Sequence, residues 1–311
     1  MNLSWPVEIW KQLVVIIVAV LLAWSVPLAI FSLIRKRRGK DFKSMWIKYA
    51  SWFVMIPAFI IPMFLGATWV QVVLLAMSLY AFEEYGRAVG LWKEKSQMWL
   101  GRACIILAYI PVFARSFGTF MSAPAYIIII IFLFPILRDR YQGMIQRTVL
   151  VIFGAIYFGW FLAHLAYLMN VDVGPQLVLA FLLIVVTNDA AAYVIGSNFG
   201  RHKMAPNISP NKTWEGAVGA MIVAVAVTLG IRFALLGMSV SVAIFVGAAL
   251  AFFGTCGDLS ISLIKRDVQI KDTGSLIPGH GGLLDRLDSI LFVAPLFFHF
   301  MNAFYINAIS I

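Results

Sequence analysis

The sequence predicts an all-α, polytopic integral membrane protein with about ten transmembrane helices, and three observations carry this prediction. Of 311 residues, 62% are hydrophobic and only 12% are charged, a balance too apolar for a soluble globular chain. The apolar residues fall into runs of roughly 20, the length that a helix needs to cross a bilayer core about 30 Å thick. These runs also lack the short alternation of barrel strands. Most of the chain is therefore expected to lie in lipid.

Each expected helix is an apolar run between charged or glycine- and proline-rich breaks. The runs lie near residues 12–34, 47–66, 68–86, 102–118, 121–137, 147–169, 175–196, 214–236, 240–264 and 289–309. The first of them is too long for a secretory signal and leads directly into a basic segment, so we expect it to be retained as a membrane helix.

Basic residues gather on every second connection between these runs. Of the 24 Lys and Arg residues, 21 lie in the segments 35–48, 87–102, 138–147, 201–212 and 265–286. By the positive-inside rule this face is cytoplasmic and both termini lie outside. The net charge of +10 therefore reflects membrane topology, and no nucleic-acid partner is expected. Segment 35–48 either only fixes topology or also binds anionic headgroups of membrane lipids.

Acidic residues inside apolar runs give the first indication of a functional site. A carboxylate at membrane depth is costly, so it is usually paired or functional. Asp189, Asp258 and Glu215 all lie toward the predicted cytoplasmic ends of their runs. They predict a water-filled funnel open to the cytoplasm. The pair Glu83–Glu84 lies at a similar depth, where it either supports this site or extends to the interface beside Arg87.

The densest polar stretch extends from Ser262 to Ser289 and combines three kinds of group. Asp285 and Asp288 are three residues apart, so they share a helix face and can hold a cation together with Asp258. Carboxylates without a His or Cys cluster favour Mg²⁺. The cations suited to a polyphosphate are Lys265, Arg266, Lys271 and Arg286. The glycines of 278–282 let backbone N–H groups approach an anion. Each feature alone is more often structural, but together they indicate phosphoryl or nucleotidyl transfer.

This stretch resembles the signature of the phosphatidate cytidylyltransferase (CDP-diacylglycerol synthase) family. The match is complete at the fixed positions of the signature, which are Ser262, Lys265, Arg266, Lys271, Asp272, Pro278, His280, Gly281, Gly282, Asp285, Arg286 and Asp288. The resemblance extends upstream to 189–196 and 209–216, although Asn211 stands where many relatives have lysine. Residues 1–170 match by hydropathy alone.

The resemblance implies an enzyme of phospholipid biosynthesis that joins CTP to phosphatidate, giving CDP-diacylglycerol and pyrophosphate. It implies Mg²⁺ bound by Asp258, Asp285 and Asp288, and leaves a second, monovalent cation such as K⁺ open. The implied catalytic residues are Lys265, Arg266, Lys271, Asp272, His280 and Arg286. The implied substrate-binding residues are Asp189, Arg201, Ser209, Lys212, Thr213 and Glu215. Whether Lys212 and Arg201 hold the nucleotide or the lipid headgroup stays open, as does the choice for Asp189 and Glu215 between the cytidine amino group, a second cation and a basic residue.

We therefore expect a scaffold of transmembrane helices over residues 1–170 and a catalytic transmembrane region over 171–311. The expected location is a bacterial inner membrane, with the site facing the cytoplasm, and the resemblance implies a homodimer. Two alternatives remain. An enzyme acting on an isoprenoid or archaeal ether phosphate shares the same motifs. A cation-coupled transporter also has intramembrane acids, but such folds often carry inverted repeats and none is visible.

Overall fold

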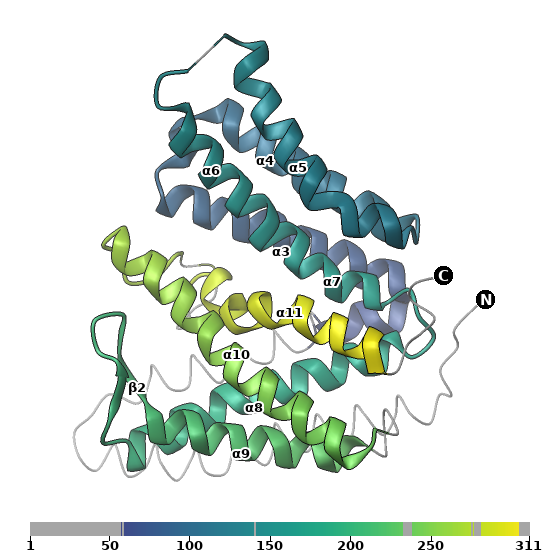
Figure 1. Ribbon diagram of the computed structural model, residues 1–311, viewed down its shortest axis with the longest axis vertical. Helices are drawn as coiled ribbons and strands as arrows, with labels where there is room; N and C mark the ends of the chain where they lie inside the picture. The colour runs from purple at the N-terminus through teal and green to yellow at the C-terminus, as the bar shows by residue number, and fades with distance from the viewer. Residues whose placement is uncertain are drawn as a thin grey trace. The chain divides into compact units, whose positions relative to one another are not determined.

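The computed structural model of the protein describes residues 57, 59–139, 141–232, 238–274, 276 and 281–304. The chain divides into two units, residues 1–66 with 277–280 and residues 67–276 with 281–311. Nearly all described residues belong to the second unit, whose elements are shown in Figure 1. The expected helix at 12–34, most of that at 47–66, and the basic segment 35–48 lie outside the described residues.

The first helices of this unit pack around a buried aromatic core. They are α3 (Ala67–Ala88), η1 (Leu91–Lys93), α4 (Lys95–Phe113), α5 (Phe117–Leu137), α6 (Met144–Gly154), the π-helical turn η2 (Ala155–Trp160) and α7 (Phe161–Leu168). Phe82, Tyr85 and Phe158 are fully or almost fully buried between them. A Cβ at Gly154 would lie 2.5 Å from the ring of Phe82, so the missing side chain lets α6 approach α3 closely.

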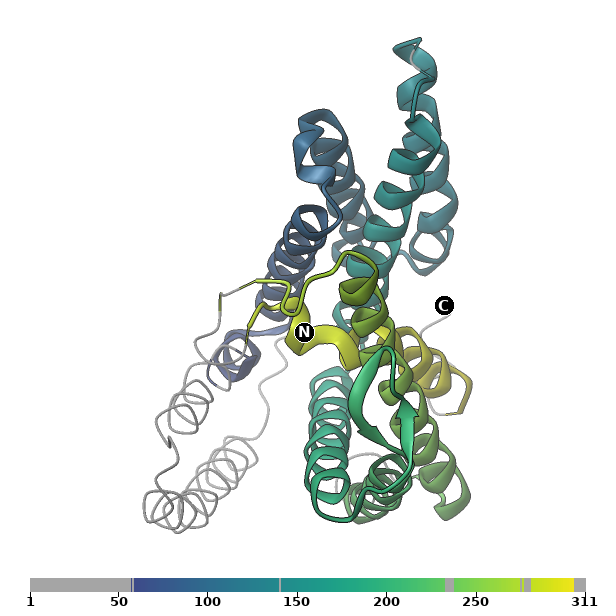
Figure 2. The same cartoon turned by 90° about the vertical axis from the view of Figure 1, so that its left-hand side faces the viewer.

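The remaining helices carry the polar sequence elements. They are α8 (Gly174–Phe199), α9 (Trp214–Ile231), α10 (Val240–Asp267) and α11 (Leu284–Phe304). Between α8 and α9 lies an antiparallel hairpin of β1 (Lys203–Ala205) and β2 (Ser209–Thr213), visible in Figure 2. Helix α9 packs on α8 and α10, while α11 packs on α10 and on α7. Helix α11 therefore connects the C-terminal helices to the N-terminal ones.

The described part of the chain confirms an all-α, multi-pass membrane protein, with one small hairpin in addition. Seven helices are long and apolar enough to cross a bilayer: α4, α5, the continuous stretch Met144–Leu168, α8, α9, α10 and α11. The expected number of ten is not confirmed. The expected run at 68–86 does form helix α3, but α3 is not one of the seven. Its last turns contain Glu83, Glu84 and Arg87, which lower its apolar character.

Helix boundaries differ from the expected ones where charged residues lie inside a helix. Helix α11 begins at Leu284 rather than near 289, because Asp285, Arg286 and Asp288 belong to its first turns. Helix α4 covers 95–113 rather than 102–118, since its first turns include Lys95 and Arg102. The hairpin at 203–213 was not expected.

Candidate functional site

The site is built where α8, α9, α10 and α11 come close together at one set of helix ends. A Cβ at Gly257 would lie 2.8 Å from the backbone oxygen of Asp288, so only glycine allows α10 and α11 to approach this closely. Likewise, a Cβ at Gly216 would lie 2.9 Å from the backbone oxygen of Ala192, which brings α9 against α8. These crossings place the polar ends of all four helices together.

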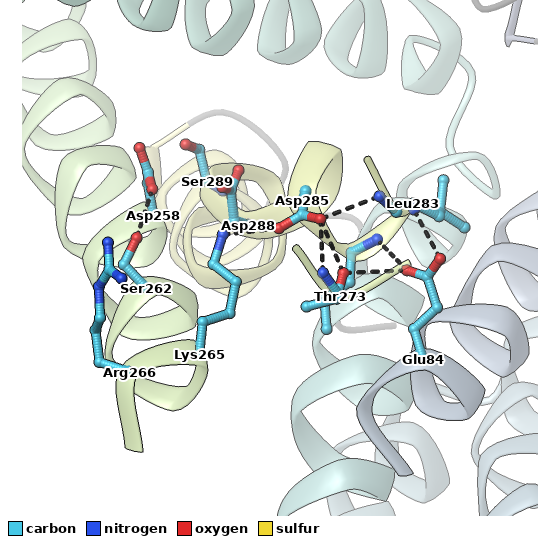
Figure 3. Close-up of polar contacts among 12 residues, drawn as sticks. Glu84, Asp258, Ser262, Lys265, Arg266, Thr273, Leu283, Asp285, Asp288 and Ser289 are labelled. Carbon is cyan, nitrogen blue, oxygen red and sulfur yellow. Dashed lines mark hydrogen bonds and ion pairs between the residues drawn. The ribbon is translucent and has the colours of Figure 1, made fainter. Parts of the chain in front are cut away.

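Three carboxylates, which we call the acidic cluster, meet at these crossings: Asp189 of α8, Asp258 of α10 and Asp288 of α11. Asp189 and Asp288 each lie close enough to Asp258, and Asp288 to Asp189, for electrostatic repulsion between them. Figure 3 shows Asp258 and Asp288 from the two facing helices. Lys212 offsets part of this charge, because its Nζ lies 2.6 Å from Asp258 Oδ2. With all three carboxylates ionised, Lys212 leaves two negative charges that are not balanced within the cluster.

Asp285 has a different environment from the acidic cluster. Its Oδ1 lies 2.7 Å from Lys265 Nζ, and its Oδ2 accepts hydrogen bonds of 3.0 Å from the backbone N–H groups of Thr273 and Gly282. Figure 3 shows its carboxylate turned toward Thr273. The structure thus brings Asp258 and Asp288 together, while one oxygen of Asp285 is held by Lys265 of α10 and the other by Thr273 and Gly282. Among the described residues, no group of three or more His, Cys, Asp or Glu side chains has the geometry to hold a metal ion.

Glu84 of α3 reaches the same turn from the N-terminal half of the chain. Its side chain is buried, and its Oε1 and Oε2 accept hydrogen bonds from the backbone N–H groups of Leu283 and Leu284, at 3.1 and 2.7 Å. Its Oε2 also lies 3.4 Å from the hydroxyl of Thr273 (Figure 3). Of the two interpretations of this residue, supporting the site or extending beside Arg87, the contacts favour the first.

The hairpin is held to the site by two predicted substrate-binding residues, Thr213 and Glu215, and by the predicted catalytic residue Arg266. The carboxylate of Glu215 accepts hydrogen bonds from the backbone N–H groups of Arg201 and His202, and Glu215 Oε1 lies 2.6 Å from His202 Nδ1. The side chain of Thr213 caps α9 by accepting a hydrogen bond from the N–H of Gly216. Arg266 Nε donates to the backbone oxygen of Ile208, 3.1 Å away, which ties the hairpin turn to α10.

The other predicted site residues lie around this core of contacts. Lys271, Asp272 and Arg286 are exposed, beside the turn that precedes α11 and in its first turn. Ser209 begins β2, and the side chain of Arg201 is exposed where the hairpin begins. His280 lies outside the described residues.

Two further residues at the site were not singled out by the sequence. Asn188, beside Asp189, is buried, and its Oδ1 has no hydrogen-bond partner among the described residues. Its amide within an apolar run was a signal that sequence reasoning overlooked. Tyr157, in the π-helical turn η2, lies with its hydroxyl 2.6 Å from Ser260 Oγ of α10. A tyrosine in an aromatic-rich run gives no comparable signal, since its contact depends on a π-helical turn that the periodicity does not reveal.

Comparisons with known proteins show the family to which the sequence is similar. The sequence profile described as the cytidylyltransferase family matches residues 46–304. The uncharacterized protein YnbB of Escherichia coli (strain K12) is 42% identical over 158 residues, which cover 48% of this chain and 53% of YnbB. The phosphatidate cytidylyltransferases of Mycobacterium bovis and Bacillus subtilis (strain 168) are each 37% identical, over 49% of this chain and over 49% and 56% of their own lengths. The chain thus spans about half the length of the curated relatives it matches.

Proposed function

Since the chain belongs to the cytidylyltransferase family, we propose that it is a phosphatidate cytidylyltransferase, which converts CTP and phosphatidate to CDP-diacylglycerol and pyrophosphate. The observation that supports this best is the acidic cluster of Asp189, Asp258 and Asp288, with Lys212 in contact with it and Lys265 further along α10, paired with Asp285. Nucleotidyl transfer requires carboxylates that can bind a metal ion and basic residues that can bind phosphates. The acidic cluster is only partly neutralised, and the lysines beside it suit phosphates.

The proposed reaction needs charge neutralisation more than it needs a protein nucleophile. An oxygen of the phosphatidate phosphate, already ionised at neutral pH, attacks the α-phosphorus of CTP and forms a new P–O bond. The bond from that phosphorus to the oxygen bridging to the β-phosphate breaks, and the electron pair leaves with pyrophosphate. Because both reactants are anions, the residues must offset repulsion and stabilise the leaving group. Lys212, Lys265 and Arg266 supply positive charge on the two elements that border the acidic cluster.

We propose Mg²⁺ as the cofactor, held by Asp258 and Asp288. Mg²⁺ binds through one or two carboxylates together with substrate phosphates and retains several waters, so it does not require a preformed three-ligand site. The surplus negative charge of the acidic cluster fits a cation, and Asn188 Oδ1, which has no hydrogen-bond partner in the described part of the chain, is a further hard donor beside Asp189. Asn188 and Asp189 are the candidate ligands of a second, monovalent cation. Asp285 remains a candidate Mg²⁺ ligand that must first release its contacts with Lys265 and the turn.

The location that we propose is the inner membrane of a bacterium, with the site on the cytoplasmic side. The apolar, exposed faces of the helices suit contact with lipid tails, and examples are Ile129 of α5 and Ile222 of α9. Asp288 lies in the first turns of α11, and Asp189 and Asp258 lie in the second halves of α8 and α10. A lipid phosphate that reaches this depth can keep its tails in the bilayer while CTP enters from water. A homodimer is proposed from the resemblance alone.

The test is turnover by the purified full-length protein in lipid nanodiscs, with radiolabelled CTP and a panel of lipid phosphates. We expect CDP-diacylglycerol from phosphatidate, with release of one pyrophosphate for each lipid formed. Activity with polyprenyl or ether-lipid phosphates but none with phosphatidate would move the assignment to a related enzyme. Asp258→Asn, in protein that reconstitutes normally, is the control that ties the activity to this site.

A further inference from the structure

We infer that Glu84, on α3, is a positioning residue that fixes the start of α11 and the glycine turn before it. By holding this turn it sets the places of Asp285 and Asp288, although it touches neither substrate nor product. The inference deepens the proposed function and rests on it, because it assigns the N-terminal half of the chain a direct part in shaping the catalytic turn.

The first line of support is the set of groups that Glu84 satisfies. The first N–H groups of a helix have no partners within it and need acceptors from elsewhere. At the start of α11, Leu283 and Leu284 donate theirs to the two oxygens of Glu84. The side chain of Glu84 comes from about 200 residues earlier in the chain and is only 4% exposed. The positive end of the helix dipole stabilises a carboxylate placed there, and the two hydrogen bonds hold it in place.

The second line of support comes from two glycines that leave room for this carboxylate. A Cβ at Gly282 would lie 2.6 Å from Glu84 Oε2, and a Cβ at Gly274 would collide with Glu84 Oε1. Real side chains do not come so close, so any larger residue at either place would displace the carboxylate. Both positions fall within the signature stretch. Their lack of a side chain leaves room for the carboxylate of Glu84 and, at Gly282, equally for the hydroxyl of Thr273, which lies 2.6 Å from the position of the missing Cβ.

The third line of support is the sharing of the turn between two carboxylates. Glu84 takes the N–H groups of Leu283 and Leu284, and Asp285 takes those of Thr273 and Gly282. The hydroxyl of Thr273 lies 3.0 Å from Asp285 and 3.4 Å from Glu84, and it has one proton to share between them. Of the backbone N–H groups of 278–282 that the sequence offered to an anion, that of Gly282 is thus taken by Asp285, and the two carboxylates together hold the turn in one shape.

Glu84→Gln tests the inference, with Glu83→Gln as the matched control. The glutamine keeps the size of Glu84 but presents an NH₂ group to one of the two N–H donors, so one hydrogen bond is lost. Glu83 is the adjacent residue and pairs with Arg102 on α4 instead. In Glu84→Gln we expect kcat to fall at least about tenfold, the rate equivalent of losing one charge-assisted hydrogen bond. Glu83→Gln should stay within about twofold of wild type.

Hydrogen exchange by mass spectrometry supplies the readout that separates a local role from general destabilisation. We expect Glu84→Gln to raise amide exchange in peptides covering 272–287, while exchange in α8 and α9 and the thermal midpoint stay near the wild-type values. Unchanged exchange at 272–287 overturns the inference, whatever the activity. If the wild-type protein makes no CDP-lipid, the proposed function fails, yet this measurement still decides whether Glu84 positions the turn.

Gly274→Ala provides an independent test if Glu84→Gln accumulates poorly. Its added methyl should displace the carboxylate of Glu84 and raise exchange at 272–287 in the same way. In a Glu84→Ala background the methyl has room, so Gly274→Ala should add nothing to the exchange caused by Glu84→Ala. Additive effects of the two substitutions would show that they act separately, and would contradict the inference.

Discussion

Lys265 Nζ lies 2.7 Å from Asp285 Oδ1, an ion pair that joins α10 to the first turn of α11. The two side chains are only 16% and 5% exposed, so little water screens their interaction. The pair ties together the two helices that also contribute Asp258 and Asp288. The conformation of the turn before α11 and the position of the acidic cluster therefore depend on each other.

Removing either partner of this pair should leave a buried, unpaired charge. We expect this to lower the free energy of unfolding by about 3–5 kcal/mol. We expect Lys265→Met and Asp285→Asn each to lower kcat at least about 100-fold. The double variant should be no worse than the poorer single one, because the second substitution removes the charge that the first left unpaired. Lys203→Met, at an exposed position in β1, is the control. Additive losses would show that the two side chains act independently.

Lys212 contacts Asp258 directly, whereas its neighbour Asn211 is exposed. We expect Lys212→Met to lower kcat/KM for CTP about tenfold or more, because the acidic cluster then repels the incoming triphosphate more strongly. Asn211→Ala should change kcat/KM by no more than about twofold. Steady-state kinetics of reconstituted protein measures both, and equal losses in the two variants would contradict a specific role for Lys212.

Chelation by EDTA should abolish CDP-lipid formation, and added Mg²⁺ should restore it, if the acidic cluster holds the ion. Asp258→Asn and Asp288→Asn should each raise the Mg²⁺ concentration needed for half-maximal activity, since each removes a hard anionic ligand. A titration of activity against free Mg²⁺ gives the comparison. Full activity in EDTA would remove the metal from the proposal.

Thr213 caps α9 from a buried position, so its loss should appear as lower stability. We expect Thr213→Ala to reduce the free energy of unfolding by about 1 kcal/mol. Thr213→Ser retains the hydroxyl acceptor and should recover most of this loss. Thermal unfolding in detergent compares the three proteins, and an unchanged midpoint for Thr213→Ala would contradict the importance of the cap.

Glu215 holds the entry to the hairpin through two backbone N–H groups and through the His202 side chain. We expect Glu215→Gln to speed proteolytic cleavage within 201–213 several-fold, because the amide cannot accept all of these hydrogen bonds. His202→Ala removes only the side-chain contact and should have a smaller effect. Equal cleavage of Glu215→Gln and wild type would show that the hairpin is held by other contacts.

Hydropathy predicted most helices of the described region because each must present a long apolar surface to lipid. It placed boundaries poorly where charged side chains occupy helix ends, as with Asp285 and Asp288 in α11. It gave no sign of the hairpin, whose short strands are polar and are stabilised by Glu215 and Arg266 rather than by an apolar face.

The sequence named residues that the structure brings close together, but it did not show the contacts between them. Sequence spacing correctly placed Asp258 near Asp288, because the two helices are consecutive and cross at Gly257. It grouped Asp285 with them, but residues three apart on a helix can still point to different partners, and here Lys265 and the turn hold Asp285. For Glu84 the sequence left two roles open, since no local pattern shows a contact formed across 200 residues.

The reach of Glu84 into the start of α11 also bears on how such a protein can be taken apart. A fragment that begins after α3 would contain the whole signature but would expose the N–H groups of Leu283 and Leu284 without an acceptor. The signature is thus not a self-contained cassette. Anyone who transplants it into another membrane scaffold, or recombines halves of two relatives, has to carry a carboxylate on the supporting helix along with it.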